Sequence, residues 1–214
     1  MITDESHYVA LAAAYARGAL GELALDDETA LARGIATNLK LHRFKRSAQL
    51  PRVRAVLGAL RGFGVTRLVD LGSGRGAFVW PLLDALPDVV LTASDLLEHR
   101  AQLFAHVQRG GIARLSAVRA DMTALPFADA SADCVTALEV LEHLPDDGPA
   151  RAIGEAMRVA RTAVIATVPS HEDENPEHVH LFDGARLEAL FRAAGARRVR
   201  VDHVLNHIVV VAVR

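Results

Sequence analysis

Three glycines at alternate positions, just after a short apolar run, form the stretch of this chain best suited to chemistry. The apolar run 68–71 leads into Gly-Ser-Gly-Arg-Gly at 72–76, and an apolar helical pattern follows. This order predicts a buried strand, a tight turn and the start of a helix. Glycines let such a turn bend sharply and let a ligand approach without meeting a Cβ, and the unpaired N–H groups at a helix start favour polar ligands. We therefore interpret the stretch as a nucleotide-binding turn.

Two ligand classes use a turn of this kind. Gly72, Gly74 and Ala77 fit the dinucleotide fingerprint G-x-G-x-x-G/A, which makes a nicotinamide-dependent oxidoreductase one interpretation. Asp70 and the three glycines fit a second pattern, D-x-G-x-G-x-G. A carboxylate beside the turn would repel a pyrophosphate, but a sulfonium amino acid tolerates it. Asp70 therefore favours a sulfonium cofactor.

An acidic residue stands at the end of each of the first four expected strands. These residues are Asp70, Asp95, Asp121 and Glu139. Ligands of parallel sheets bind at the carboxyl ends of the strands, and acids gathered there are costly unless a ligand or hydrogen-bond donors satisfy them. Asp95 follows the glycines by about 20 residues, the spacing of a carboxylate that binds ribose hydroxyls. Taken singly, each acid could instead be a helix cap.

The elements that must position these residues alternate between strands and helices. Strands are expected at 66–71, 89–94, 114–119, 133–140, 162–168, 198–204 and 208–213, and helices at 77–86, 97–109, 146–160 and 183–194. Three further helices, at 5–20, 28–46 and 51–61, come first, and Pro81 is expected to kink the helix that holds it. The alternation predicts an α/β fold with a doubly wound parallel sheet. The last two strands are joined too briefly for a parallel crossover, so they must form an antiparallel hairpin.

The glycine motif, the strand-tip acids and this strand pattern together resemble the class I S-adenosylmethionine-dependent methyltransferases. The resemblance implies a Rossmann-like sheet of seven strands, mostly parallel with an antiparallel C-terminal hairpin strand. It implies one methyltransferase domain over 1–214, with an N-terminal helical cap at 1–64 and a Rossmann-like core at 65–214. By the same resemblance, Asp70 helps to hold the cofactor's ammonium group, Asp95 the ribose and Asp121 the adenine amino group. The full set assigned to S-adenosylmethionine is Asp70, Gly72, Ser73, Gly74, Gly76, Asp95, Leu96, Asp121, Met122 and Glu139.

A second motif, Glu-Val-Leu-Glu-His at 139–143, follows the fourth expected strand. With a later histidine it resembles the metal site of the small-RNA 3′-terminal 2′-O-methyltransferases, where two carboxylates and two imidazoles hold a divalent ion. That resemblance implies Mn²⁺, Mg²⁺ or Zn²⁺ bound by Glu139, Glu142, His143 and one of His178 or His180. Such an ion would lower the pKa of a hydroxyl acceptor. The gap from Glu139 to the later histidines is shorter than in that family, and no RNA-binding domain is evident. Without a metal, His143 could act as a general base, and the motif could also be a purely structural turn.

Charge is distributed unevenly along the chain. Between Glu28 and Asp70 nine cations occur without one acid, namely Arg33, Lys40, Arg43, Lys45, Arg46, Arg52, Arg54, Arg61 and Arg67. Basic helix faces are usually only solvated, but this segment precedes the expected site and would suit an anionic acceptor. Aromatic residues for stacking bases are scarce, so RNA is not favoured as a partner. We expect a small-molecule acceptor, with a phosphate or carboxylate group allowed by the charge pattern and a hydroxyl as the methylated group.

Composition limits the class of protein and its compartment. The chain is 51% hydrophobic and 23% charged, which predicts a folded core rather than disorder. The single cysteine, Cys134, lies in an apolar run and is expected in a strand core, and one thiol agrees with a reducing cytoplasm. An acidic N-terminus and the lack of an 18-residue apolar run predict neither a signal peptide nor a membrane span. The oligomeric state stays open, a homodimer included.

Overall fold

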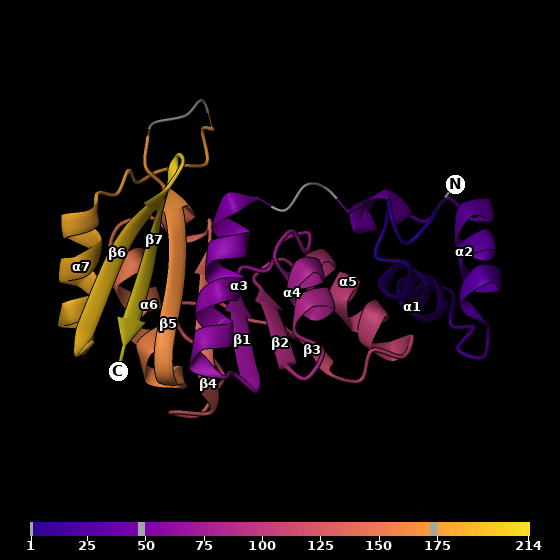
Figure 1. The fold of residues 1–214 in the computed structure, drawn as a ribbon, viewed down its shortest axis with the longest axis horizontal. Helices are drawn as coiled ribbons and strands as arrows, with labels where there is room; N and C mark the ends of the chain where they lie inside the picture. The colour runs from indigo at the N-terminus through magenta and orange to yellow at the C-terminus, as the bar shows by residue number, and fades with distance from the viewer. Residues whose placement is uncertain (1, 47–49, 172–174) are drawn as a thin grey trace. The chain divides into compact units, whose positions relative to one another are not determined.

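The computed structural model describes residues 2–46, 50–171 and 175–214, and Figure 1 shows its ribbon. The strands are β1 (Arg67–Leu71), β2 (Val90–Asp95), β3 (Leu115–Arg119), β4 (Ala132–Leu138), β5 (Ala160–Pro169), β6 (Arg198–Val204) and β7 (His207–Val213). They form one sheet in the order β3-β2-β1-β4-β5-β7-β6. The pairs β1–β4, β2–β3 and β4–β5 are parallel, whereas β7 pairs antiparallel with β5 and β6. The predicted Rossmann-like α/β sheet with an antiparallel C-terminal hairpin is confirmed.

The helices lie close to their expected positions. They are α1 (Val9–Leu20), α2 (Asp27–Ala36), α3 (Pro51–Phe63), α4 (Val79–Ala85), α5 (Glu98–Arg109), α6 (Gly148–Val159) and α7 (Gly184–Ala193), with 3₁₀ turns η1 (Leu41–Phe44) and η2 (Leu141–His143). Local signals set several of the ends. Asp183 caps α7 by accepting a hydrogen bond from a backbone N–H, and Gly64 ends α3 in the left-handed conformation.

The helix expected over 28–46 is shorter than predicted. Asp26 caps its start, but α2 ends at Ala36. Asn38 adopts a positive φ of 57°, and the N–H of Leu39 donates to the carbonyl of Gly34. This left-handed ending satisfies a terminal carbonyl and turns the chain away from the helix axis, so the basic residues after it lie in a loop and in η1.

Pro81 does not occupy the interior of its helix. α4 begins at Val79, two residues later than the sequence predicted, which places Pro81 in the first turn. The N–H groups of a first turn have no partner inside the helix, so a proline there removes no hydrogen bond. The predicted kink was wrong because it depended on where the helix begins.

The chain forms two compact units. Unit 1 comprises Met1–Gln49 and Ser73–Arg119, and unit 2 comprises Leu50–Gly72 and Ala120–Arg214. The helices of the expected cap at 1–64 fall in both, because α1 and α2 belong to unit 1 and α3 to unit 2. A division of the chain into cap and core stays a prediction.

The core of unit 1 depends on two backbones that touch. A Cβ on Gly18 of α1 would lie 1.9 Å from the carbonyl oxygen of His106 in α5. A Cβ on Gly110, just after α5, would lie 1.7 Å from the carbonyl oxygen of Ala14. Only glycine allows this approach. The contact holds α1 against α5 and so positions the chain that leads on to η1.

Unit 2 has its core between the sheet and the helices α6 and α7. A cluster of buried apolar side chains joins β1, β4, β5 and β7 to both helices. Cys134 of β4 is fully buried, and burial raises the pKa of its thiol to about 12, which confirms its expected place in a strand core. In the described part of the chain, no helix combines the length and apolar character needed to cross a bilayer.

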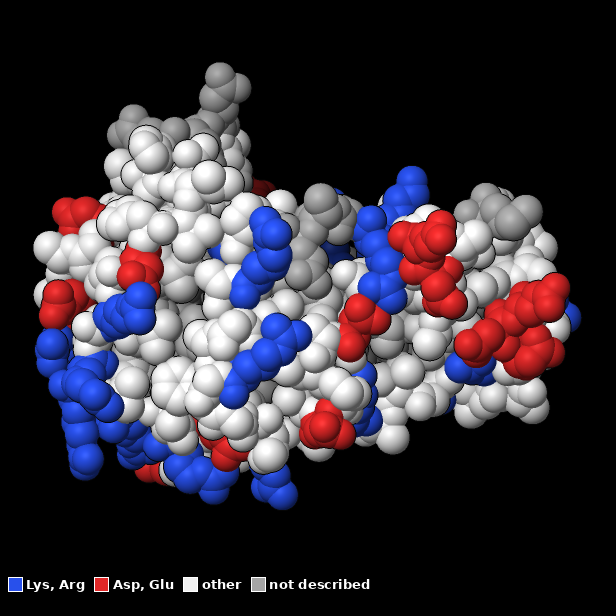
Figure 2. All heavy atoms as spheres, viewed as in Figure 1, with Lys and Arg blue, Asp and Glu red and all other residues white. Residues whose placement is uncertain are grey.

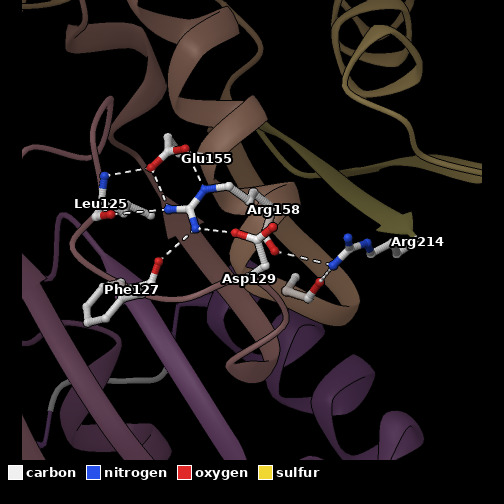
Figure 3. Close-up of polar contacts among 7 residues, drawn as sticks. Leu125, Phe127, Asp129, Glu155, Arg158 and Arg214 are labelled. Carbon is white, nitrogen blue, oxygen red and sulfur yellow. Dashed lines mark hydrogen bonds and ion pairs between the residues drawn. The ribbon is translucent and has the colours of Figure 1, made fainter.

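One arginine ties the loop before β4 to helix α6 in unit 2. Figure 3 shows the guanidinium of Arg158 among Glu155, Asp129 and the carbonyls of Leu125 and Phe127. It donates to both carboxylates and to both carbonyls over 2.7–3.2 Å. Glu155 also accepts a hydrogen bond of 2.7 Å from the N–H of Leu125. The loop that follows the Asp121 strand tip is therefore fixed to the helix.

Candidate functional site

The glycine turn is built from positions that exclude a side chain. Gly72, Gly74 and Gly76 all have positive φ angles, of 64°, 59° and 88°. Within unit 2, a Cβ on Gly72 would lie 2.4 Å from a methyl carbon of Val140, and within unit 1 a Cβ on Gly76 would lie 2.1 Å from the indole of Trp80. The sequence predicted this turn correctly, because glycine alone combines left-handed backbone with such close approach.

Asp95 holds the turn from within unit 1. Its side chain is 4% exposed, and one carboxylate oxygen accepts a hydrogen bond of 2.9 Å from the N–H of Gly74. The other oxygen accepts one of 2.9 Å from the N–H of Leu97, and Arg100 lies 3.6 Å away. The N–H of Ser73 donates to the carbonyl of Ser94 over 2.9 Å. A carboxylate has about four acceptor positions, so Asp95 retains capacity for a ligand hydroxyl. Leu96, beside it, is 58% exposed.

Asp70 is buried on β1 in unit 2, with 2% of its surface exposed. The hydroxyl of Thr136 donates to its carboxylate over 2.7 Å, and the two residues are register partners on β1 and β4. Thr136 has no role among the residues predicted from sequence. Its signal is a single hydroxyl within the apolar run 134–138. The hydroxyl of Thr136 therefore orients the Asp70 carboxylate at the end of β1.

Asp121 and Met122 follow β3 and belong to unit 2. Asp121 is exposed and accepts hydrogen bonds of 2.8 Å from both the backbone N–H and the hydroxyl of Thr123. These bonds hold the pKa of the Asp121 carboxyl below its usual range. Asp121 thus closes a turn, which is close to the capping role left open for it. Met122 is 7% exposed and packs in the core of unit 2.

Glu139 lies directly after β4 with a strained positive φ of 53°. Thr167 donates to one of its carboxylate oxygens over 2.6 Å, and Nε2 of His207 lies 3.1 Å from the other. Nε of Arg52 lies 3.7 Å from the first oxygen. The sequence analysis missed Arg52 and Thr167 as partners, because they come from α3 and β5, far along the chain. Glu139 is therefore held by a cation, a hydroxyl and an imidazole at the sheet edge of unit 2.

Three of the five predicted metal ligands lie together in unit 2. One ligand atom each from Glu142, His143 and His178 falls within 4.8 Å of the others, and the two imidazole rings lie 4.7 Å apart. The backbone carbonyl of Glu142 accepts hydrogen bonds of 2.9 and 3.2 Å from the N–H groups of Val179 and His180, which fixes the later loop against η2. A carboxylate with two imidazoles suits a divalent ion chemically, and it equally suits a hydrogen-bonded base.

The other two predicted ligands have different surroundings. Glu139 is bonded to Thr167 and lies beside His207. The ring of His180 packs 5.6 Å from that of Phe182 and is absent from the cluster around His143. The two histidines of the 178–180 loop therefore face different neighbours, as side chains two residues apart in an irregular loop often do.

Known proteins resemble this chain over part of its length. Residues 68–163 match a family model described as a methyltransferase domain. A malonyl-[acyl-carrier protein] O-methyltransferase from Methylococcus capsulatus is 29% identical over 167 residues, which are 69% of this chain and 58% of that protein. The chain thus spans less than two thirds of the length of this relative.

Solved structures share the fold. A SAM dependent methyltransferase from Aquifex aeolicus is 20% identical, with a TM-score of 0.61 over 73% of this chain and 87% of the other. Magnesium protoporphyrin IX methyltransferase from Synechocystis, solved with bound S-adenosylhomocysteine, is 18% identical, with a TM-score of 0.58 over 76% and 81%. The Rossmann-like methyltransferase fold that the glycine turn predicted is therefore shown.

Proposed function

We propose that this chain transfers a methyl group from S-adenosylmethionine to a small-molecule acceptor, because residues 68–163 match a methyltransferase domain and the fold is shared with S-adenosylmethionine-dependent methyltransferases. The observation that carries this proposal is the glycine turn, in which Gly74 donates to Asp95 and the close neighbours of Gly72 and Gly76 leave no room for a side chain. The family match favours this activity over the nicotinamide-dependent alternative. The carboxylate of Asp70 beside the turn favours it as well, since it suits a sulfonium amino acid.

We assign the cofactor to the strand ends and the turn between them. Asp70 would hold the ammonium group, and the backbone of 72–76 would hold the methionine portion. Asp95 would accept hydrogen bonds from the ribose hydroxyls while it keeps the N–H of Gly74 in place. Leu96, Asp121 and Met122 would contact the adenine. Glu139 would act at the sulfonium end of the cofactor. Its hydrogen-bonded neighbours would hold its carboxylate in place there.

An oxygen atom is the best-supported methyl acceptor. The relative from Methylococcus is named as an O-methyltransferase of malonyl-[acyl-carrier protein], and a malonyl group ends in a carboxylate. In the transfer, an oxygen lone pair forms the new O–C bond, the C–S bond breaks, and the sulfonium becomes a neutral thioether. Alignment of the two reacting atoms supplies most of the rate. A carboxylate oxygen needs no base, whereas a hydroxyl must lose its proton.

His143 is our candidate for taking that proton from a hydroxyl acceptor. Glu142, His143 and His178 would also be the residues to hold a divalent ion, and such an ion would lower the pKa of the hydroxyl. The dispersal of Glu139 and His180 leaves three ligands where the resemblance implied four. That difference favours the base over the metal, and over the related alternative of a metal-dependent RNA terminal 2′-O-methyltransferase.

Direct titration with S-adenosylhomocysteine tests the proposal. The full chain should bind S-adenosylhomocysteine and not NAD, measured by calorimetry. Asp95→Ala should weaken binding at least about tenfold, since hydrogen bonds to a charged group contribute about 1.5–3 kcal/mol each. Asp88→Ala, which removes an exposed carboxylate of the same unit, serves as the control and should leave binding unchanged.

Two results would contradict the assignment. A dissociation constant unaffected by Asp95→Ala would remove Asp95 from the ribose site. Binding of NAD with no binding of S-adenosylhomocysteine would overturn the methyltransferase proposal itself. Asp95→Asn, which retains one acceptor oxygen, shows whether any loss arises from the turn or from the charge.

A further inference from the structure

A hollow of about 540 Å³ opens in unit 1 beside the glycine turn. Its wall combines the residues around η1 with Tyr8, just before α1, and with the start of α4. Gly76 of the turn and Trp80 of α4, which lies against it, both belong to this wall. The hollow therefore adjoins the backbone that we assign to the methionine portion of the cofactor.

Among the described residues, four permanent cations line this hollow and no acid does. They are Lys40, Arg43, Lys45 and Arg75, which we call the cationic pocket. In the described part of the chain none of the four makes an ion pair. Charges of one sign gathered around a cavity raise the local concentration of the opposite charge. The pocket is therefore set up electrostatically for an anion.

Arg46, which follows Lys45 in sequence, is an arginine with a structural role in unit 1. Its guanidinium donates two hydrogen bonds of 2.8 Å to Asp84 and lies 4.3 Å from the ring of Tyr8. The bidentate pairing lowers the pKa of Asp84. Arg46 thus differs from Lys40, Arg43 and Lys45, for which the described residues supply no ion-pair partner, and we exclude it from the cationic pocket.

Two neighbouring groups favour an anion in the same place. The pKa of the His7 imidazole is lowered, first by burial and then by the charge of Lys45, so the positive field already extends to this ring. The indole N–H of Trp80 is buried without a hydrogen-bond partner in the described part of the chain, and Trp80 is 2% exposed. An N–H group can only donate, so it suits an oxygen anion.

We propose that the cationic pocket binds the carboxylate or phosphate group of the methyl acceptor. This proposal rests on the proposed methyltransferase function, because it requires that the protein has a methyl acceptor. The cofactor's amino-acid end is the other possible source of a carboxylate. It carries an ammonium group as well, and four cations without an acid would repel that ammonium group. The excess positive charge therefore favours the acceptor.

A second hollow, of about 860 Å³ in unit 2, shows why charge alone is insufficient. Its wall includes Arg192, Arg198 and Arg200, and Figure 2 shows blue arginine side chains gathered below the ends of α7 and β6. Arg192 pairs with Glu188 at 3.2 Å and Arg200 with Asp202 at 2.6 Å. These charges are largely compensated locally, unlike those of the cationic pocket.

Anion binding to the full chain, saturated with S-adenosylhomocysteine, tests the proposal. The probes are malonate and inorganic phosphate, with uncharged malonamide for comparison. Malonate or phosphate should bind and malonamide should not, measured by calorimetry. The double variant Arg43→Gln/Arg75→Gln should weaken anion binding at least about tenfold, as loss of charge-assisted hydrogen bonds does. The control Arg109→Gln/Arg197→Gln makes the same change of net charge at exposed sites and should have no effect.

The outcomes separate this proposal from the one on which it rests. Wild-type protein that binds S-adenosylhomocysteine but neither anion, or binds malonamide as tightly as malonate, overturns the cationic pocket. A pocket variant that loses S-adenosylhomocysteine and anion binding to the same degree assigns the charges to the cofactor's carboxylate and also overturns it. Absence of S-adenosylhomocysteine binding with anion binding intact counts against the methyltransferase function alone. Arg43→Lys, which keeps the charge, should restore most of the affinity lost in Arg43→Gln.

Discussion

At His143, the hydrogen bond made by one ring nitrogen determines what the other nitrogen can do. Nδ1 lies 3.0 Å from the backbone carbonyl of Glu177. A carbonyl oxygen only accepts, so Nδ1 carries the hydrogen and Nε2 presents a lone pair. The same tautomer serves a general base and a metal ligand. The two roles must therefore be separated by experiment.

His143→Gln should lower the turnover of a hydroxyl acceptor about 10²-fold or more, because general-base catalysis contributes on that scale. Its affinity for S-adenosylhomocysteine should stay within about twofold of wild type. Turnover of a carboxylate acceptor, which has no proton to lose, should change little. Steady-state kinetics with both acceptor classes checks this, and His203→Gln, at an exposed position of β6, is the control.

Chelation separates the base from the metal. Enzyme treated with EDTA and free of divalent ions by elemental analysis should keep its activity if His143 is the base. Activity that is lost on chelation and restored by Mn²⁺ would contradict the base and support the set Glu142, His143 and His178. An equal loss of turnover and cofactor affinity in His143→Gln would make the residue structural.

At the scale of the element, Arg158 fixes a loop by donating hydrogen bonds to its carbonyls, much as a capping residue satisfies the free backbone groups at a helix end. Its guanidinium satisfies two carbonyls and two carboxylates, so the segment 125–129 has a fixed path across α6 (Figure 3). The backbone of Arg158 and Ala160 in turn accepts hydrogen bonds from Arg214 at the chain end. The sequence alone does not distinguish Arg158 from the other arginines on helix faces.

Arg158→Ala should lower the free energy of unfolding by about 2 kcal/mol, because it leaves half-buried carbonyls without a donor. Arg151→Ala, on the same helix, removes only an exposed ion pair at 3.4 Å to Asp147 and should cost less than about 0.5 kcal/mol. Urea unfolding of the two variants measures the difference. Equal effects would show that the network adds nothing beyond helix propensity.

Element-scale rules predicted much of this fold, and they failed in identifiable places. Alternating patterns of strands and helices depend on neighbours in sequence, and the elements that they predicted are present. The end of α2 and the position of Pro81 within α4 depend on the backbone conformation of several consecutive residues together, so residue patterns did not predict them. The partners of Glu139 could not be predicted, because Arg52 and His207 approach it only after the chain has folded. Likewise, nothing local distinguishes Arg43, which lines a cavity, from Arg46, which pairs with Asp84.

At the scale of the whole molecule, several carboxyl groups have a lower pKa in the folded state than in the unfolded chain. Asp84, Asp121, Asp133 and Glu155 all have lowered pKa values. For Asp133, partial burial alone would raise the pKa, but hydrogen bonds from Thr66 and Arg67 and the ion pair with Arg161 lower it well below its ordinary 3.8. Each of these groups loses its proton more readily in the folded state than in the unfolded chain.

Stability should therefore fall in acid. A carboxyl with a lowered folded-state pKa stabilises the fold above its unfolded pKa, near pH 4, and loses that contribution as the pH falls through the folded value. The urea midpoint of the full chain should hold between about pH 7 and 5 and decrease steadily below about pH 4. Asp133→Asn should begin less stable at pH 7 and show a shallower decrease. A midpoint independent of pH down to about pH 3 would contradict the cited shifts.

The meeting of α1 and α5 limits how freely this protein can be redesigned. Positions 18 and 110 each face a carbonyl oxygen at under 2 Å from where a methyl group would sit. A library that randomises α1, α5 and the residue after α5 will accordingly recover glycine at these two sites. Any attempt to graft a different front helix onto the chain must import a glycine at the same crossing point.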